Sequence, residues 1–114
     1  MAYARIYEVT RVKRFLSISK DIFDWVWSNG WDTGTCGGGV WFDNNFSGKE
    51  TIENVQMIQL GLKLARLSGE TKYRDKAKQV LRWVLRVGIV NSTSYQVYDG
   101  VNLTSCQVRI PDCK

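Results

Sequence analysis

The chain has 114 residues, a formal net charge of +5 and 44% hydrophobic residues, a composition that fits one globular domain. It contains no histidine, which excludes His-based catalytic triads, helical His-Glu zinc sites and mixed Cys/His zinc fingers. The basic residues are spread along the chain, and no apolar run reaches the roughly 20 residues of a membrane span, so we expect no nucleic-acid partner and no membrane segment.

Two parts of the sequence, 4–30 and 62–88, align without a gap at an offset of 58 residues. The alignment pairs Trp25 with Trp83, and a valine follows each tryptophan. Such a match indicates one structural unit written twice. Each copy has the pattern of a helix, a short polar turn and a second helix.

The second helix of each copy has an apolar face at helical spacing. Gly30 and Gly88 end the two copies, and both suit the left-handed residue that closes a helix. Between the copies we expect a glycine-rich loop and then a helix from about Glu50 to Leu67, while residues 89–114 combine short β-like runs with turn residues. The apolar faces comprise Phe15, Ile18, Ile22, Trp25 and Val26 in the first copy and Tyr73, Ala77, Val80, Leu81 and Val84 in the second.

These patterns predict an all-α fold of two antiparallel helical hairpins, each followed by a long loop. Because the loops follow equivalent helices, both should leave the same end of the hairpins, where functional sites are commonly built. Two hairpins seldom bury both of their faces. The chain is therefore expected to be a piece of a larger fold, and its exposed hairpin faces predict self-association.

The three cysteines include no CxxC pair, so we expect no structural zinc and no other metal or cofactor. A disulfide between Cys36 and Cys106 would tie the two loops together, and two free thiols are the alternative. Cys113 has no evident partner.

Three consecutive glycines, Gly37 to Gly39, stand within the stretch TCGGGVWFD. A phosphate-binding P-loop would need Lys-Ser/Thr after the glycines, and VWFD stands there instead. Two interpretations remain open: the Trp41 ring packs into the core while the glycines make a sharp turn, or the glycines let a sugar approach the backbone beside the rings of Trp41 and Phe42. In the second case the polar side chains that would bind sugar hydroxyls are Asp43, Asn44, Asn45 and Asn54.

Asn45, Asn91 and Asn102 each begin an N-x-S/T sequon in a predicted loop, where a glycan could be attached. Together with the cysteines, the sequons predict glycosylation at these asparagines and a protein of the secretory pathway. The first residues, MAYARIYEVTRVKR, lack the apolar core of a signal peptide. A secreted parent would therefore carry its signal peptide outside this chain.

An ordered set of motifs runs from about Ala4 to Cys106. It consists of CGGGVWF, then a lysine and I-x-N at a helix start, then LARLSGETKYRDKAKQVLRWVLRVGIVN, and then VYDGVN followed by a cysteine. The set resembles glycoside hydrolase family 76, the endo-α-1,6-mannanases and related enzymes. The resemblance implies an (α/α)6 toroid of six helical hairpins with the active site at one end, of which residues 1–114 would form a partial domain of roughly two hairpins.

The resemblance also implies substrate-binding residues in the loop that lines the family's cleft, at the helix start after it and in the family's Asp-Gly turn. These residues are Gly38, Gly39, Trp41, Lys49, Asn54 and Asp99, with Ile52 also matching the helix start. The family commonly has Glu directly after the asparagine of the helix start, where this chain has Val55, a departure that bears on mannan specificity.

The family's catalytic pair is two adjacent aspartates, and this sequence contains no Asp-Asp, so we expect no catalytic residue here. Asp43 and Asp99 lie on the two same-end loops and could approach each other as the carboxyl pair of a glycosidase. Their neighbours are turn residues, and no flanking pattern indicates that one carboxyl group is buried with a raised pKa.

We therefore expect a part of a secreted glycoside hydrolase that contributes substrate-cleft loops to the hydrolysis of α-mannosidic bonds in a polysaccharide or oligosaccharide, and that is inactive alone. One alternative is a non-catalytic carbohydrate-binding module, which would bind α-mannosides as a monomer without hydrolysing them. The other is a helical-repeat protein whose partner covers its open faces, which would form oligomers and bind no glycan.

Overall fold

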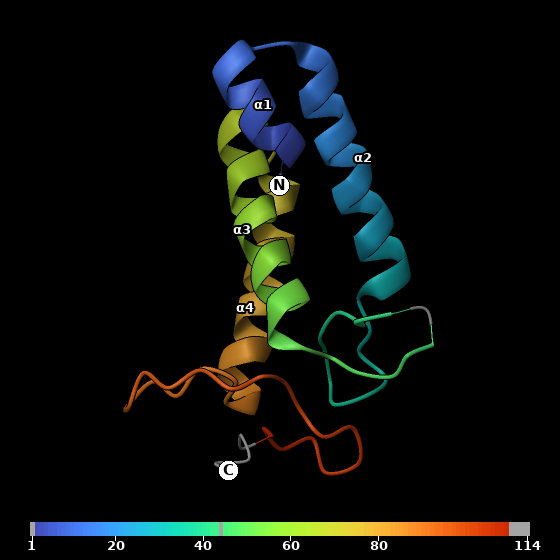
Figure 1. Cartoon of the computed structure of the whole chain (residues 1–114), viewed down its shortest axis with the longest axis vertical. Coiled ribbons are helices and arrows are strands. Elements are labelled where there is room, and N and C mark those ends of the chain that lie inside the picture. Colours follow the sequence, from blue (N-terminus) through green and yellow to red (C-terminus); the bar gives the residue numbers. More distant parts are fainter. Residues whose placement is uncertain (1, 44, 110–114) are drawn as a thin grey trace.

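A computed structural model of the chain describes residues 2–43 and 45–109; Asn44 and Cys113, both named above, lie outside this part. The described residues form four helices: α1 (Ala2–Thr10), α2 (Lys13–Gly30), α3 (Thr51–Ser68) and α4 (Thr71–Val87). They pair as two antiparallel hairpins, α1 with α2 and α3 with α4 (Figure 1). The predicted all-α fold of two helical hairpins is confirmed.

The α3–α4 hairpin supplies most of the core, because both helices turn an apolar face inward. Gly61 lets the two helices approach closely, since a Cβ atom there would lie 2.8 Å from the Tyr73 carbonyl oxygen and 2.9 Å from the Ala77 side chain. Phe23 of α2 packs edge-on against the Tyr73 ring, with the ring centroids 5.2 Å apart. Buried apolar residues of α3 and α4 are Met57, Leu60, Leu64, Tyr73, Ala77, Val80, Trp83 and Val84.

Part of the apolar surface predicted on the helices remains open. Ile22 and Trp25 of α2 are 40% and 61% exposed, and Leu81 of α4 is 40% exposed. The side chains placed on these faces by helical spacing are therefore only partly used by the core of the described chain. This result agrees with the expectation that two hairpins leave faces uncovered.

The two copies of the longer repeat end differently. Gly88 has a φ of 87° and closes α4 as the predicted left-handed residue. Gly30 is instead the last residue of α2, and the capping residue is Trp31 in an extended conformation, so the prediction for Gly30 was wrong. The absence of a side chain at Gly30 serves packing, because a Cβ atom there would lie 3.0 Å from Val40, the residue that bridges to Trp31.

The loops that follow α2 and α4 lie at the same end of the hairpins, as predicted (Figure 1). We call residues 31–50 the glycine loop and residues 88–109 the C-terminal loop. The structure contains the predicted disulfide between Cys36 and Cys106, which joins the two loops with the Cα atoms 5.3 Å apart. The β-like runs expected in the C-terminal loop form only isolated β-bridges within its described residues.

The C-terminal loop contains a second, shorter repeat that the sequence analysis missed. Residues 90–98 and 101–109 read VNSTSYQVY and VNLTSCQVR, with six of nine positions identical. We call them the first turn and the second turn. In both turns the asparagine Oδ1 atom, of Asn91 or Asn102, accepts hydrogen bonds of 2.9 and 3.0 Å from the backbone N–H groups two and three residues later. The repeat therefore builds the same turn twice.

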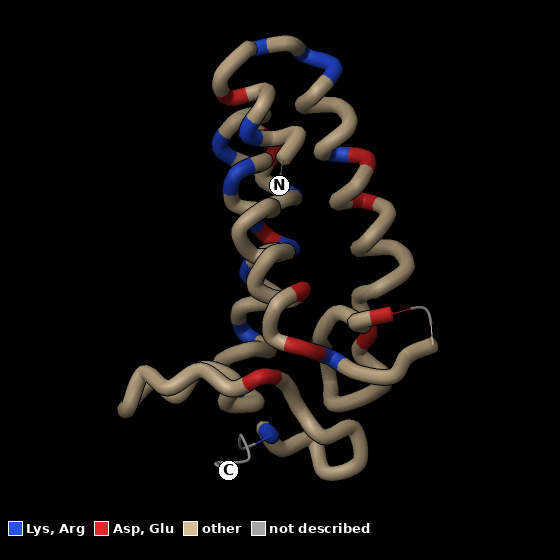
Figure 2. The backbone as a smooth tube through the Cα atoms, viewed as in Figure 1, with Lys and Arg blue, Asp and Glu red and all other residues tan. Residues whose placement is uncertain are grey.

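Ion pairs connect the helices away from the loops. Glu8 of α1 contacts Arg66 at 2.6 Å and Lys63 at 3.3 Å on α3, and Arg5 at 2.8 Å on its own helix. Hydrogen bonds from Arg66, Arg5 and Lys63 lower the pKa of Glu8 to about 2. Other acidic residues gather at the loop end of the molecule, at the start of α3 and in both loops (Figure 2).

Candidate functional site

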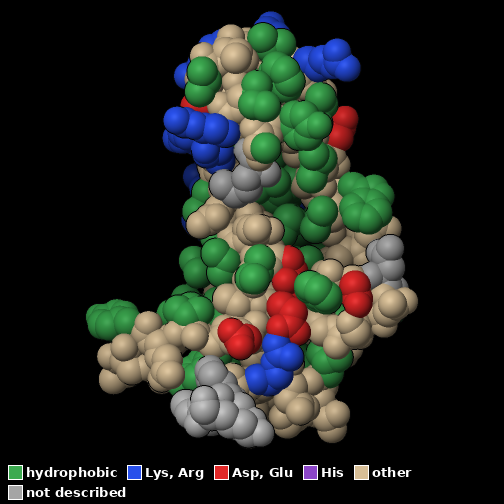
Figure 3. All heavy atoms as spheres, in the orientation of Figure 1, with side chains coloured by type: hydrophobic (Ala, Val, Ile, Leu, Met, Phe, Trp, Pro, Cys, Tyr) green, Lys and Arg blue, Asp and Glu red, His purple; other side chains and the backbone are tan. Residues whose placement is uncertain are grey.

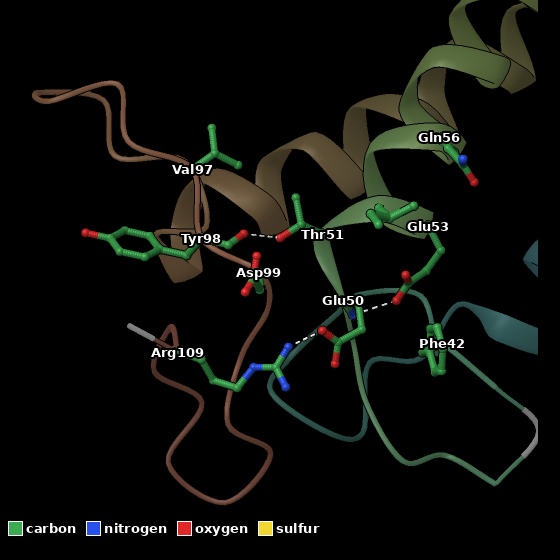
Figure 4. A pocket seen from close by; sticks show the side chains of 10 residues that line it. Phe42, Glu50, Thr51, Glu53, Gln56, Val97, Tyr98, Asp99 and Arg109 are labelled. Atoms are coloured by element: carbon green, nitrogen blue, oxygen red, sulfur yellow. Dashed lines mark hydrogen bonds and ion pairs between the residues drawn. The ribbon is translucent and has the colours of Figure 1, made fainter. Parts of the chain in front are cut away.

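A groove of about 800 Å³ opens at the loop end, between the start of α3 and the C-terminal loop (Figure 4). Phe42 of the glycine loop adds an aromatic ring to the lining. A concave site of this size, with apolar side chains and a few polar groups, is typical of small-molecule binding. The lining residues are Phe42, Glu50, Thr51, Ile52, Glu53, Gln56, Val97, Tyr98, Asp99 and Arg109.

Hydrogen bonds hold the two walls of this groove together. The Thr51 hydroxyl donates to the Tyr98 carbonyl oxygen, and the Thr51 backbone N–H donates to the Asp99 carbonyl oxygen at 2.8 Å. The Arg109 guanidinium group forms an ion pair with the Glu50 carboxylate across the groove (Figure 4). The start of α3 and the C-terminal loop therefore form one connected surface.

Two glutamates begin α3 with a capping box. The Glu53 carboxylate accepts a hydrogen bond of 2.5 Å from the Glu50 backbone N–H, and the Glu50 side chain accepts one from the Glu53 backbone N–H. Burial raises the pKa of Glu53 to about 7, although its backbone hydrogen bonds and the Arg109 charge act in the opposite direction. A carboxyl group that is partly protonated near neutral pH therefore lines the groove. Figure 3 shows the acidic side chains gathered beside a basic one at this end of the visible face.

Lys49 lies inside the glycine loop with no exposed side-chain surface. Its Nζ atom donates to the carbonyl oxygens of Asp32 at 3.0 Å, Thr35 at 2.6 Å and Gly38 at 2.5 Å, and it forms an ion pair of 2.9 Å with the Asp32 carboxylate. Burial lowers the pKa of Lys49, against the raising effect of Asp32. The Trp41 ring centroid lies 4.7 Å from the same Nζ atom, within cation–π range. One buried ammonium group thus binds backbone carbonyl oxygens from three positions of the loop.

The glycine run is required for close packing against Trp83. A Cβ atom on Gly38 would lie 2.6 Å from the Trp83 ring, and one on Gly39 would lie 2.8 Å from both Trp83 and Lys49. The Trp83 Nε1–H group donates to the Cys36 carbonyl oxygen at 2.9 Å. The backbone freedom in this loop therefore lets the chain lie directly on the indole ring.

Asn54 fastens the start of α3 to the end of the glycine loop. Its Oδ1 atom accepts from the Val40 backbone N–H at 2.8 Å, and its Nδ2 atom donates to the carbonyl oxygens of Val40 at 3.2 Å and Glu50 at 2.7 Å. Asn54 and Lys49 are both buried and bonded to backbone groups. The predicted substrate-binding role of these two residues therefore stays a prediction, and burial means that they would act through the position of the loop.

Trp41 and Asp99 remain accessible at the loop end. Trp41 is half-buried and lines a hollow of about 220 Å³ that shares Phe42 and Glu53 with the larger groove. Asp99 is exposed on the wall of the larger groove. The glycines therefore serve packing, and the Trp41 ring is half-buried instead of packed in the core. The interpretation that a sugar binds beside this ring stays a prediction.

Asp43 and Asp99 line different hollows. Asp43 lines the smaller hollow and accepts hydrogen bonds from the Ser47 hydroxyl at 2.5 Å and the Ser47 backbone N–H at 3.0 Å. These hydrogen bonds lower the pKa of Asp43. A general acid of a glycosidase needs a raised pKa instead.

Most of the groove lining was missed from the sequence. The residues not named there as candidates are Glu50, Thr51, Glu53, Gln56, Val97, Tyr98 and Arg109. The Glu50-x-x-Glu53 spacing resembles a capping box and could have marked both carboxyl groups at a helix start. The nine-residue match between the two turns aligns Arg109 with Tyr98, and it could have predicted that Arg109 lies at the loop end.

The predicted sequons all lie in loops. Asn45 and Asn102 are exposed, and Asn91 is half-buried. Within residues 2–43 and 45–109, no group of three or more His, Cys, Asp or Glu side chains is placed to hold a metal ion. No helix in this part of the chain combines the length and apolarity needed to cross a membrane.

Comparisons with known proteins agree with this architecture. The sequence profile of glycosyl hydrolase family 76 matches residues 1–111. A Schizosaccharomyces pombe protein described as a mannan endo-1,6-alpha-mannosidase is 40% identical over 96 residues, which cover 80% of this chain and 22% of the relative.

Two solved structures share the fold. A family 76 glycoside hydrolase from a bovine Bacteroides thetaiotaomicron strain matches with a TM-score of 0.77 and 28% identity, over 95% of this chain and 24% of the other. Dfg5 from Chaetomium thermophilum, in complex with glucosamine, matches with a TM-score of 0.61 and 27% identity, over 70% and 20%. This chain thus spans about a fifth to a quarter of these relatives. Its two hairpins match part of their fold, as expected for a portion of a six-hairpin toroid, and the chain belongs to glycosyl hydrolase family 76.

Proposed function

We propose that this chain is part of a secreted glycoside hydrolase and supplies one wall of the cleft in which α-mannosidic bonds of a polysaccharide or oligosaccharide are hydrolysed. The observation that carries this proposal is the groove of about 800 Å³ at the loop end of a family 76 chain. The mannan endo-1,6-alpha-mannosidase of Schizosaccharomyces pombe supports α-mannan as the substrate class. The disulfide and the three sequons support secretion and glycosylation.

The proposed substrate contacts come from the accessible side chains of the loop end. The Trp41 and Phe42 rings offer apolar faces to the C–H face of a pyranose, and the carboxyl groups of Asp99 and Glu53 accept hydrogen bonds from sugar hydroxyls. Four of the predicted substrate-binding residues are buried in or against the glycine loop, and we propose that they affect substrate binding only by holding the shape of the loop. These residues are Gly38, Gly39, Lys49 and Asn54.

The chain supplies binding surface without the reacting groups. Retaining glycosidases place two carboxyl groups about 5 to 5.5 Å apart across the scissile bond, and one of them needs a raised pKa. This sequence has no adjacent aspartates, and Asp43 has a lowered pKa. Glu53 has a raised pKa, but its carboxyl group is bonded to the Glu50 backbone N–H in the capping box of α3. We propose that residues 1–114 are a partial domain that binds α-mannosides and does not cleave them alone.

Titration calorimetry of the 114-residue chain with α-1,6-linked mannotriose tests this function. Asp99→Ala is expected to weaken binding roughly 10-fold, because it removes a charged hydrogen-bond acceptor from the groove. Asp75→Ala removes the same charge from the exposed surface of α4 and should leave the affinity unchanged. Equal affinity of the Asp99→Ala variant, or release of mannose by the purified chain, would contradict the proposal.

We also propose that copies of this chain associate with one another through the exposed apolar faces of the hairpins. Trp25 of α2 and Leu85 of α4 are 61% and 49% exposed, which is unusual for such large apolar side chains in a stable monomer. We expect the isolated chain to form oligomers that Trp25→Ser weakens, measured by size-exclusion chromatography with light scattering. A monomer at about 100 μM would refute this part, since apolar patches of this kind associate at such concentrations.

A further inference from the structure

The first and second turns have the same backbone pattern but different attachments. In the second turn, Cys106 forms the disulfide to the glycine loop, and Arg109 forms the ion pair to α3. The equivalent positions of the first turn hold Tyr95 and Tyr98. The two positions that attach the second turn to the protein are therefore both tyrosines in the first.

Neither tyrosine ring has a comparable attachment within the described chain. Tyr95 is 82% exposed, the largest fraction among the exposed large apolar and aromatic residues. The Tyr98 hydroxyl donates only to the Gln96 side chain of the same turn, at 3.1 Å. Figure 1 shows the first turn, in orange, projecting away from the helices. The Tyr95 ring is thus held out from the body on a defined turn, whereas the half-buried Tyr98 lies where this turn meets the groove.

The backbone that presents Tyr95 is fixed. Tyr95 has a φ of 60°, a left-handed conformation that costs a non-glycine residue stability. The Tyr95 backbone N–H donates to the Asn91 carbonyl oxygen at 2.7 Å, and the Asn91 N–H donates to the Gln96 carbonyl oxygen at 2.8 Å. These bonds fix the backbone from which the ring projects before any ligand arrives, which lowers the ordering cost of binding.

The chemistry of the first turn suits a neutral sugar. Residues 90–98 contain no charged side chain; hydroxyl and amide groups surround the tyrosines instead. Aromatic faces can pack against the C–H face of a pyranose, while hydroxyls and amides exchange hydrogen bonds with sugar hydroxyls. The polar members of the turn are Asn91, Ser92, Thr93, Ser94 and Gln96.

The first turn also leads directly into the groove. Val97, Tyr98 and Asp99 line the groove, and Tyr95 precedes Val97 by two residues on the same turn. The exposed ring is therefore carried by the segment that forms one wall of the groove.

We infer that Tyr95 and Tyr98 form an aromatic platform that binds a neutral sugar unit of the polysaccharide next to the unit held in the groove. This inference rests on the proposed function and extends it, because it makes the affinity depend on chain length. Tyr98 lines the groove and Tyr95 does not, so the Tyr95 ring adds contacts for oligosaccharides that reach beyond the groove and none for a disaccharide within it.

The test compares α-1,6-linked mannobiose and mannohexaose by titration calorimetry on the 114-residue chain. The hexaose should bind more tightly than the biose, and Tyr95→Ala should weaken hexaose binding roughly 3- to 10-fold while leaving biose binding unchanged. Tyr95→Phe keeps the ring and should retain hexaose affinity. Tyr3→Ala removes a partly exposed tyrosine from α1, away from the loops, and should change neither affinity. Far-UV circular dichroism confirms that each variant is folded.

Each other outcome overturns the platform in a recognisable way. If biose binding is lost in Asp99→Ala but hexaose binding is unchanged in Tyr95→Ala, the platform is wrong and the groove proposal stands. If the wild-type chain binds neither sugar, both proposals fail. Bacterial and eukaryotic preparations should agree; if Tyr95→Ala has an effect only when Asn91 carries a glycan, the ring packs on that glycan and the platform is refuted.

Discussion

Replacing Lys49 with methionine tests whether one buried ammonium group holds the glycine loop together. Methionine keeps a similar length and an unbranched apolar stem but cannot donate hydrogen bonds. The substitution removes the ammonium donor from the carbonyl oxygens of Asp32, Thr35 and Gly38. It also breaks the ion pair with the Asp32 carboxylate, which keeps its hydrogen bond from the Thr35 backbone N–H. We expect the loop to loosen and the free energy of unfolding to fall.

The size of the loss follows from the burial of each partner. Breaking a buried ion pair by removing one partner costs about 3–5 kcal/mol, because the remaining charge stays desolvated. The Asp32 side chain is 30% exposed, whereas that of Lys49 is fully buried, so the Asp32 carboxylate regains water when Lys49 is removed. We therefore expect a loss of about 2–3 kcal/mol, a large share of the roughly 5–15 kcal/mol that stabilises a typical domain.

Urea unfolding followed by tryptophan fluorescence and circular dichroism measures this loss. Lys78→Met makes the same substitution at an exposed position of α4 and should change stability by less than about 0.5 kcal/mol. If Lys49→Met unfolds at the same urea concentration as the wild type, the ammonium group does not organise the loop, and the argument from its four contacts is refuted.

Three further predictions concern the loops. Gly39→Ala should cost about 2–4 kcal/mol in urea unfolding, because a Cβ atom meets Trp83 and the φ is 99°; Gly69→Ala, with a φ of 75° and nothing within 4 Å, should cost only about 1 kcal/mol, and equal losses would contradict the packing role. The pKa of Glu53 is raised from 4.5 to about 7 on folding, so the folded state binds the proton more tightly than the unfolded state. The free energy of unfolding should therefore decrease as the pH rises from about 4.5 to 7. We expect a fall of about 1 kcal/mol after allowance for partial exposure, absent in Glu53→Gln; the same slope in both proteins would refute it. Replacing Cys36 and Cys106 with alanine removes a cross-link between residues 70 positions apart. The free energy of unfolding should fall by roughly 4 kcal/mol, because the unfolded chain gains conformational entropy. An unchanged urea midpoint would argue against the disulfide as a stabiliser.

The architecture could be predicted because it depends on periodicity. Apolar residues at helical spacing and the 58-residue repeat place two hairpins and bring both loops to one end, whichever contacts form in detail. The role of Gly30 could not be predicted the same way, because a glycine at a helix end serves either a left-handed cap or close packing. The choice depends on Val40, which packs against Gly30 only in the folded chain.

The site was harder to predict for a related reason. A motif residue can contact the ligand or support the loop that does, and sequence alone does not distinguish them. Lys49 and Asn54 are surrounded by backbone acceptors and donors, so we expect them to act as supports. The capping-box spacing could have placed Glu53 at the helix start, but its position in the groove and its raised pKa depend on burial in the folded chain, which no local pattern records.

Support and contact are therefore divided between different parts of this site. The residues that match the family motif, among them Gly39, Lys49 and Asn54, mostly build the inside of the glycine loop against Trp83. The groove lining is shared between motif and other positions. Five lining residues belong to the motifs, namely Phe42, Ile52, Val97, Tyr98 and Asp99, and the others are Glu50, Thr51, Glu53, Gln56 and Arg109. Val55, where the family commonly has Glu, does not line the groove, and Glu53 supplies a carboxyl group two residues earlier. Because neighbouring helix positions point in different directions, we expect the Glu53 carboxyl group to approach a ligand from another direction than a glutamate at position 55 would.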